Sequence, residues 1–194
     1  RLNLITCHLG AGCSIAAIKE GKVVDTSMGL TPLEGLMMGT RSGDVDPGVI
    51  FHLMENLKMG PKEINDLLNK KSGLAGISGK GKDMRSILKG YKDGNKRCKL
   101  AIEMFCYRLK KYISAYSGIL GRVDAIVFTA GIGENVPLIR KLSTDIEFLK
   151  IKIDSKRNLN DETIISSIGS KVKVFVIPTD EEKMIALETL GLVK

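Results

Sequence analysis

Apolar residues at the beginning of the chain occur in the short runs that are typical of strands. Such runs lie at residues 2–7, 15–18 and 22–26. A glycine-bearing turn at residues 8–14 follows the first run, and residues 19–21 form a short link between the second and the third. Because short Gly-containing links join neighbouring antiparallel strands, we expect these three strands to form an antiparallel meander.

The next part of the chain combines a glycine-rich loop with helical patterns. Residues 29–48 hold five glycines in twenty positions, too many for a regular helix or strand. Helices are expected at about 47–57 and 61–70, the second with Pro61 in its first turn. From Leu100 to Tyr116 apolar residues recur at helical spacing, which predicts an amphipathic helix.

The last third of the chain alternates strands and helices. A nearly continuous apolar run at 123–129 predicts a strand in the buried middle of a parallel sheet, followed by a glycine-bearing turn at 131–135. A helix, a polar segment at 154–163, a strand at 172–177 and a last helix from about 180 to 190 complete the pattern.

The predicted order is thus βββαβαβα with inserted helices. It predicts an α/β fold on a mixed sheet and resembles the ribonuclease-H-like domain of the actin and sugar-kinase superfamily. With 194 residues, 43% of them hydrophobic, the chain has enough apolar material for one substantial core. We therefore expect residues 1–194 to form a single domain.

Composition excludes several other classes of protein. No apolar stretch approaches the roughly 20 residues of a membrane-spanning helix, and the first residues do not resemble a signal peptide. The four cysteines form no Cys-x-x-Cys pair, so we expect free thiols in a reducing cytoplasm and no zinc site. The net charge of +8 comes from basic residues spread among acids without aromatic platforms, which argues against a nucleic-acid partner.

Three glycine-rich turns are candidates for chemistry: residues 8–12, 29–48 and 131–135. Glycines let backbone N–H groups approach phosphate oxygens closely. Neither the P-loop pattern nor a Gly-x-Gly-x-x-Gly run between a strand and a helix is present, which argues against P-loop and dinucleotide chemistry. Taken singly, each turn is more often structural than functional.

Two longer motifs change this assessment. The segment Thr-Pro-Leu-Glu-Gly-Leu-Met-Met-Gly-Thr-Arg-Ser-Gly-Asp at 31–44 and the segment Val-Phe-Thr-Ala-Gly-Ile-Gly-Glu-Asn at 127–135 closely resemble two signatures of the acetate kinase family. The resemblance extends over nearly the whole chain. It implies a nucleotide-binding C-terminal domain of an enzyme that converts ATP and acetate to ADP and acetyl phosphate, with Mg²⁺, or Mn²⁺ in its place, as metal.

The resemblance also implies the nucleotide-binding residues. They lie along the nucleotide phosphates (His8, Leu9, Gly10, Ala11 and Gly12), beside the nucleoside (Asp83, Met84 and Arg85) and around the adenosine (Gly131, Ile132, Gly133, Glu134 and Asn135). One position departs from the family pattern, since most members carry Asn where this chain has Ala11. A side-chain amide contact to the nucleotide is then missing, while backbone N–H contacts remain.

Arg41 is the candidate catalytic cation. Phosphoryl transfer spreads negative charge over the equatorial oxygens of the moving group, and a permanently charged, planar guanidinium can hold two of them at once. An isolated arginine near Asp44 or Asp46 would more simply form an ion pair. Within the signature at 31–44, the resemblance favours the catalytic role.

Glu181 is the candidate metal-binding acid, and Pro32 is the candidate for the carboxylate pocket. Acids such as Glu181 and Glu182 at a helix N-terminus are also explained by the helix dipole alone. The resemblance of Thr-Asp-Glu-Glu at 179–182 to a family segment selects Glu181 for magnesium, with Glu182 as the alternative. Pro32 matches a residue that lines the acetate pocket in the family, and it would otherwise form a rigid turn.

The resemblance further implies that the N-terminal domain of the parent enzyme is absent. In the family that domain supplies a catalytic histidine, a second arginine and a magnesium-site asparagine, so we expect this chain to bind nucleotide without turnover. We also expect a homodimer that pairs through this domain. Two alternatives stay open: a propionate or butyrate kinase domain, and a non-catalytic actin-like nucleotide-binding module.

Overall fold

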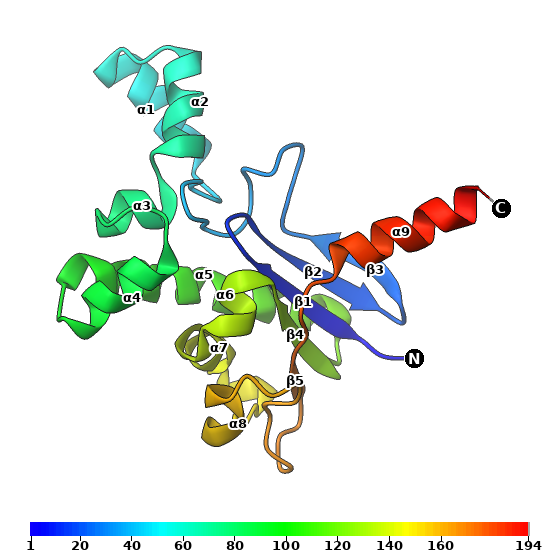
Figure 1. The fold of residues 1–194 in the computed structure, drawn as a ribbon. Coiled ribbons are helices and arrows are strands. Elements are labelled where there is room, and N and C mark those ends of the chain that lie inside the picture. Colours follow the sequence, from blue (N-terminus) through cyan, green and yellow to red (C-terminus); the bar gives the residue numbers. More distant parts are fainter. Residues whose placement is uncertain (194) are drawn as a thin grey trace.

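The core of the fold is a mixed five-stranded sheet. The computed structural model describes residues 1–193, and Figure 1 shows the sheet at its centre. The strand order is β3-β2-β1-β4-β5, in which β1 pairs antiparallel with β2 and parallel with β4. The strands are β1 (Leu4–Leu9), β2 (Cys13–Lys19), β3 (Lys22–Thr26), β4 (Ala125–Thr129) and β5 (Lys173–Val176). The predicted α/β, ribonuclease-H-like fold on a mixed sheet is confirmed.

The first hairpin is tighter than the sequence predicts. The predicted strand at 2–7 begins at Leu4 and continues through Leu9, because His8 pairs with Ser14 and Leu9 pairs with Cys13. The expected turn at residues 8–14 therefore shrinks to residues 10–12, where the N–H of Gly10 donates to the carbonyl of Gly12 at 3.0 Å. The meander of β1, β2 and β3 is as predicted.

One face of the sheet is covered and the other is partly open. The long helix α5 (Lys96–Leu120) packs against β1 and β2. It starts four residues before the predicted Leu100, because the side chain of Asn95 caps it by accepting from the N–H of Cys98 at 3.0 Å. The covered face contributes buried residues to one core with α5: Ile5, Cys7, Leu9, Cys13, Ile15, Ala17, Ile126, Phe128, Val174 and Val176.

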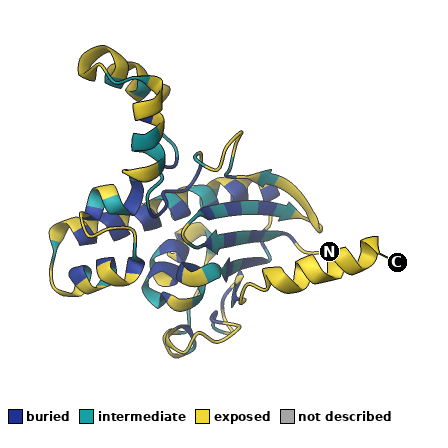
Figure 2. Cartoon of the chain, turned by 45° about the horizontal axis from the view of Figure 1, so that its top comes forward, coloured by how far each residue is buried: buried dark blue, intermediate teal, exposed yellow. Residues whose placement is uncertain are grey.

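Two helices form an arm that extends away from the sheet in Figure 1. They are α1 (Pro47–Leu57) and α2 (Pro61–Lys70), both within the predicted bounds. In Figure 2 most of this arm is exposed or half-buried. The helices α3 (Gly73–Ser78) and α4 (Met84–Lys92) follow and were not predicted individually, since both are short and contain glycine.

The segment after β4 differs most from the prediction. Residues 131–135, predicted as a turn, belong to a short helix, α6 (Ala130–Asn135). Its two glycines lower helix propensity, but Arg140 donates to the carbonyls of Gly133 and Glu134 and so stabilises it. The other elements are α7 (Pro137–Thr144), the 3-10 turn η1 (Glu147–Leu149), α8 (Ser155–Leu159) and α9 (Glu181–Leu192).

The four cysteines are free and buried. Burial raises the pKa of the Cys7 thiol, and it raises the pKa of Cys13 to about 12. The thiols of Cys7 and Cys13 therefore remain protonated, and all four cysteines serve as small core side chains. Among residues 1–193, no helix combines the length and the apolar character needed to cross a membrane.

The glycine-rich loop before α1 is held in place by backbone hydrogen bonds. The N–H of Asp44 donates to the carbonyl of Gly35 at 3.0 Å, and the carboxylate of Asp44 accepts from the N–H of Gly35 at 2.8 Å. Gly43 has a φ of +69°, and a Cβ on it would lie 2.5 Å from the carbonyl oxygen of Gly35. Only glycine fits at this position.

We expect Gly43→Ala to destabilise the fold far more than Gly21→Ala. Gly21 also has a positive φ, +88°, but an added Cβ there meets nothing within 4 Å. Left-handed backbone alone should cost Gly21→Ala about 1 kcal/mol of unfolding free energy. The added clash should raise the loss for Gly43→Ala to roughly 3 kcal/mol or more. Urea denaturation measures both losses, and equal losses would contradict the steric argument.

Candidate functional site

The three predicted glycine-rich segments meet at one edge of the sheet. Because β1 and β4 are parallel, their carboxyl ends lie side by side, with His8 opposite Thr129 in the register. The turn at residues 10–12 leaves β1 at this edge, and α6 leaves β4 there. The N–H of Gly39 in the long loop donates to the carbonyl of Ala11 at 3.4 Å, which brings the third segment to the same place. Ligands of open α/β sheets bind at such carboxyl ends.

A pocket of about 750 Å³ opens between these segments and α4. Apolar side chains of Met84, Leu88, Ile132 and Val136 form part of its wall, a setting that suits a flat ring. The complete lining is Gly10, Ala11, Gly39, Lys82, Asp83, Met84, Arg85, Leu88, Gly131, Ile132, Asn135 and Val136. The pocket thus brings together some of the predicted residues from each of the three nucleotide-binding groups.

Asp83 and Arg85 form a linked pair at the edge of this pocket. The Asp83 carboxylate caps α4 by accepting from the N–H of Arg85 at 2.9 Å, and it accepts from Nη2 of Arg85 at 2.8 Å. The side-chain hydrogen bond from Arg85 holds the pKa of Asp83 below its ordinary value. Asp83 is therefore ionised at neutral pH and keeps the exposed guanidinium of Arg85 at the entrance of the pocket.

A second, more polar pocket of about 560 Å³ also borders α6. Its lining contains four acidic residues and comprises His8, Ala130, Gly131, Glu134, Thr179, Asp180, Glu181 and Glu182. Gly131 lines both pockets. The candidate metal acid Glu181 and the backbone at the end of β4 thus face the same space.

Thr179 connects this acidic turn to α6. One oxygen of the Glu134 carboxylate accepts from both the N–H and the hydroxyl of Thr179, each at 2.9 Å. The Thr179 hydroxyl oxygen accepts from the N–H of Ala130 at 3.0 Å and lies 3.0 Å from the hydroxyl of Thr129. Since the single Thr179 hydroxyl proton goes to Glu134, Thr129 is the donor in the last contact. The Glu134 carboxylate is thereby directed toward Thr179, and Glu134 does not line the 750 Å³ pocket.

The acidic pocket offers oxygen ligands without a complete cage. Among residues 1–193, no group of three or more His, Cys, Asp or Glu side chains lies close enough to hold a metal ion. Carboxylate oxygens nevertheless suit Mg²⁺, which is usually held by one or two carboxylates together with water and substrate phosphate. Asp180 caps α9 by accepting from the N–H of Lys183 at 3.2 Å, which leaves the carboxylates of Glu181 and Glu182 exposed.

Arg41 lies beside the turn that follows β1. Its Nη1 is 3.3 Å from the position that a Cβ on Gly12 would occupy. The same nitrogen donates to the carbonyl of Pro32 at 3.3 Å. Within residues 1–193, Arg41 forms no ion pair with Asp44 or Asp46, so its positive charge is available to a ligand. Pro32 is exposed and lines neither pocket, and its carbonyl contact with Arg41 is what ties it to the site.

Asp44 instead anchors the long loop to α5. Its carboxylate accepts from the hydroxyl of Tyr112 at 2.9 Å and from Nη1 of Arg108 at 3.3 Å, and its carbonyl accepts from Nη2 of Arg108 at 3.0 Å. Partial burial and the contact with Asp44 raise the pKa of Tyr112, so its hydroxyl remains a donor. Asp44 therefore positions the loop that carries Arg41.

Some predicted residues contribute backbone only, and some lining residues were missed. The side chain of Leu9 is in the core, and Gly133 is a buried residue of α6 without a side chain, so neither offers a side chain to a ligand. Four residues line the main pocket but were not predicted as site residues: Gly39, Lys82, Leu88 and Val136. Lys82 follows Gly79, Lys80 and Gly81, a basic glycine-containing stretch that could have indicated a phosphate contact.

Comparison with known proteins identifies the family that this chain resembles. The sequence model of the acetokinase family matches residues 1–187. The chain is 57% identical to the acetate kinase of Caldicellulosiruptor saccharolyticus, an alignment that covers 100% of this chain and 50% of the relative. It is 55% identical to the acetate kinase of Treponema denticola over 98% of this chain. The chain thus spans about half the length of the curated relatives it matches.

Comparison with solved structures points to the same family. The crystal structure of Porphyromonas gingivalis acetate kinase superposes with a TM-score of 0.95 and 51% identity, covering 100% of this chain and 49% of that one. A propionate kinase from Francisella tularensis superposes with a TM-score of 0.93 and 47% identity, covering 97% of this chain and 49% of that one.

We expect Tyr112→Phe to loosen the attachment of the long loop. Loss of a hydrogen bond to a half-buried carboxylate should lower the free energy of unfolding by about 1.5 kcal/mol. Tyr107→Phe is the matched control on the same helix, because Tyr107 is 67% exposed. It should change stability by less than about 0.5 kcal/mol. Urea unfolding followed by circular dichroism compares the two variants, and an unchanged midpoint for Tyr112→Phe would count against the anchor.

Proposed function

This chain belongs to the acetokinase family, and we propose that the protein containing it transfers the terminal phosphoryl group of ATP to acetate. The products are ADP and acetyl phosphate. The observation that carries this proposal is the meeting of the 750 Å³ pocket, the acidic pocket and Arg41 at one edge of the sheet. The larger pocket can accommodate a nucleotide base, the acidic pocket a metal ion, and the space beside Arg41 the phosphate that is transferred.

The larger pocket is proposed to hold the adenosine. Its apolar wall of Met84, Leu88, Ile132 and Val136 suits the adenine ring, and the exposed Arg85 lies where a sugar or phosphate would leave the pocket. The turn at residues 10–12 is proposed to contact the phosphates through its backbone N–H groups. Ala11 offers no side-chain hydrogen bond there, so these contacts depend on the main chain.

Arg41 is proposed to stabilise the transition state. Its Nη1 lies beside Gly12, next to the proposed path of the phosphates, and its charge is held in place by the Pro32 carbonyl. A guanidinium in this position can donate two parallel hydrogen bonds to the equatorial oxygens of the transferred group. The anchoring of its loop through Asp44 means that little reorganisation is needed at the moment of reaction.

Glu181 is proposed to hold the metal, directly or through water, with Glu182 as the alternative. Mg²⁺, or Mn²⁺ in its place, would neutralise charge on the phosphates when bound. Glu134 and Thr179 hold the acidic turn against α6, and therefore near the nucleotide pocket. This chain's own contribution is to fix the distance between the metal-binding acid and the nucleotide.

The phosphoryl acceptor and the oligomeric state are proposed from the similarity to the family. Acetate is the acceptor in the relatives named acetate kinase, and the similarity to a propionate kinase keeps propionate as the alternative. Pro32 is proposed to border the carboxylate pocket. We further propose a cytoplasmic homodimer that pairs through this domain. Leu100 and Met104, exposed apolar positions on α5, support such a surface.

We expect Arg41→Ala and Arg41→Lys in the full-length protein to lower kcat by at least about 100-fold. Lysine should fail as well, because a single ammonium cannot replace the planar fork of arginine. Hydroxamate detection of acetyl phosphate measures the rate. The control is Arg122→Ala. Arg122 precedes β4 at the opposite edge of the sheet and pairs with Asp124. Activity in Arg41→Ala equal to that of the control would refute the catalytic role.

We expect the 194-residue chain to bind ATP with Mg²⁺ but to form no acetyl phosphate with acetate. Ala11→Asn should strengthen binding about threefold to tenfold, the value of one added hydrogen bond. Arg85→Ala should weaken binding. Isothermal titration calorimetry measures the affinities.

Two results would contradict this view. Robust acetyl phosphate formation by the 194-residue chain would show that the other half of the family's architecture is dispensable. An unchanged affinity in Ala11→Asn would show that the side chain at position 11 does not face the nucleotide as proposed.

A further inference from the structure

Arg140 is a charged residue that neither pocket uses. It lies on α7 and has no exposed surface, although an unpaired charge in such a place would be very costly. It lines neither the 750 Å³ pocket nor the acidic pocket. The contacts of its guanidinium indicate its role instead.

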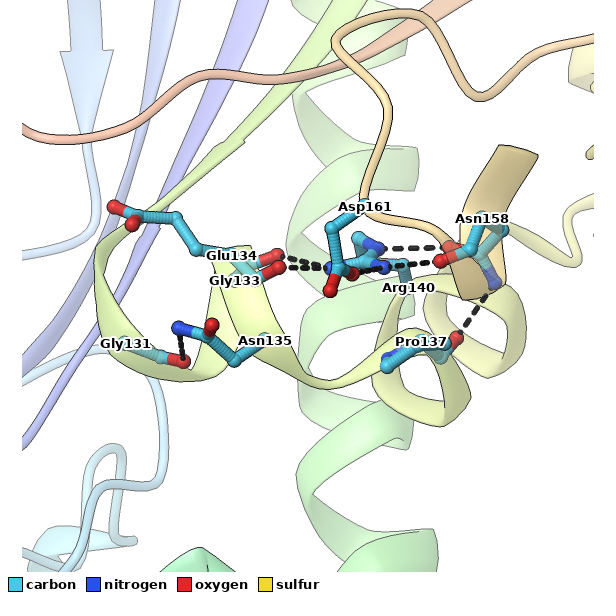
Figure 3. Close-up of polar contacts among 8 residues, drawn as sticks. All are labelled: Gly131, Gly133, Glu134, Asn135, Pro137, Arg140, Asn158 and Asp161. Carbon is cyan, nitrogen blue, oxygen red and sulfur yellow. Dashed lines mark hydrogen bonds and ion pairs between the residues drawn. The ribbon is translucent and has the colours of Figure 1, made fainter.

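All three nitrogens of the guanidinium donate hydrogen bonds, as Figure 3 shows. Nε donates to Oδ1 of Asn158 at 2.8 Å, and Nη2 donates to the Asn158 carbonyl at 2.6 Å and to the carboxylate of Asp161. Nη1 donates to the carbonyl of Gly133 at 2.9 Å and to that of Glu134 at 2.6 Å. The five contacts match the five N–H donors of an arginine, and Asp161 supplies the compensating charge.

The two backbone carbonyls belong to the end of α6, and the sequence explains why the carbonyl of Gly133 needs a donor. In a continuing helix the carbonyl of Gly133 would accept from the N–H four residues later. That residue is Pro137, which has no N–H. Arg140 therefore supplies the hydrogen bond that proline cannot.

Helix α6 depends on such outside support. It has six residues, two of them glycine, and it begins at Ala130 with a φ of +62°, a conformation that costs energy for alanine. A helix this short is unstable by itself. Its position is fixed at the C-terminal end by Arg140 and at the other side by the contact of Glu134 with Thr179. In Figure 3 the Glu134 side chain points away from Arg140, so the two attachments are separate.

The same helix forms a wall of both pockets. Gly131, Ile132 and Asn135 line the larger pocket, and Gly131 and Glu134 line the acidic one. A shift of α6 would therefore change the space for the base and the position of the acidic turn together.

We propose that Arg140 is a positioning residue for nucleotide binding, which holds α6 in place from the protein interior through the carbonyls of Gly133 and Glu134. The segment with Asn158 and Asp161 is the fixed support on the other side of the guanidinium. The proposal rests on the proposed function, because it takes the 750 Å³ pocket to be the nucleotide pocket. Arg140 touches no substrate in this arrangement and acts through α6.

Two variants test the proposal in the full-length protein. Arg140→Lys keeps the charge but cannot reach all five acceptors. Asp161→Asn leaves Arg140 intact and removes the charge of its partner, whose side chain is 42% exposed, so this variant should fold even where the first does not. We expect KM for ATP to rise at least tenfold in Arg140→Lys and twofold to threefold in Asp161→Asn. KM for the carboxylate should change by less than twofold, whereas kcat should also fall, because α6 holds the acidic turn through Glu134.

A matched control separates positioning from general loss of stability. Ile113→Ala removes a fully buried side chain of α5 that lies outside both pockets. Measured well below its unfolding temperature, it should leave KM for ATP unchanged. An unchanged KM for ATP in the folded Arg140→Lys variant overturns the proposal. If Arg140→Lys does not fold, an unchanged KM in Asp161→Asn overturns it.

Amide hydrogen exchange provides a readout that does not depend on the proposed function. If Arg140 positions α6, exchange at residues 131–136 should accelerate in the variants more than elsewhere in the chain. Uniform acceleration, as in Ile113→Ala, would overturn the proposal. Should the wild-type protein bind no ATP, the proposed function fails, and the exchange pattern alone decides whether Arg140 holds α6.

Discussion

The parallel pairing of β1 with β4 is the constraint on which the site depends. The two strands are more than a hundred residues apart, yet their register places His8 beside Thr129 at one edge of the sheet. The turn at residues 10–12 and α6 both leave the sheet at that edge. Because the strands run in the same direction, their carboxyl ends open into a common space. An antiparallel pairing would have put the two glycine-rich segments at opposite edges.

Two charged side chains, one half-buried and one buried, complete this arrangement. Each binds a glycine-containing stretch of backbone from the side that faces the protein interior. Asp44 binds Gly35 within the long loop and Tyr112 and Arg108 on α5, and it thereby sets the position of Arg41. Arg140 performs the corresponding task for α6. Glycine-rich segments let backbone approach a ligand closely, but they have little conformational preference of their own. Paired charges in the interior supply the rigidity that these segments lack.

Much of the fold and part of the site could be predicted from local patterns. Alternating and continuous apolar runs gave the five strands to within two residues, and helical spacing gave α1, α2 and most of α5. The prediction for residues 131–135 was wrong, because their glycines are typical of a turn while the helix there depends on Arg140. The C-terminal end of β1 also differs from the prediction, since pairing with β2 extends the strand beyond its apolar run.

The sequence by itself determined the order of the elements, the glycine-rich motifs and membership of the acetokinase family, because these are encoded in local periodicity and in contiguous residues. Only the tertiary structure decided which charges are partners. The partner of Asp44 is Arg108 on α5 and not the neighbouring Arg41, and Arg140 is buried against Asn158 and Asp161. Such pairs join residues that are distant along the chain or on different elements, and no local period signals them. They form only when packing of the whole domain brings the donors and acceptors together.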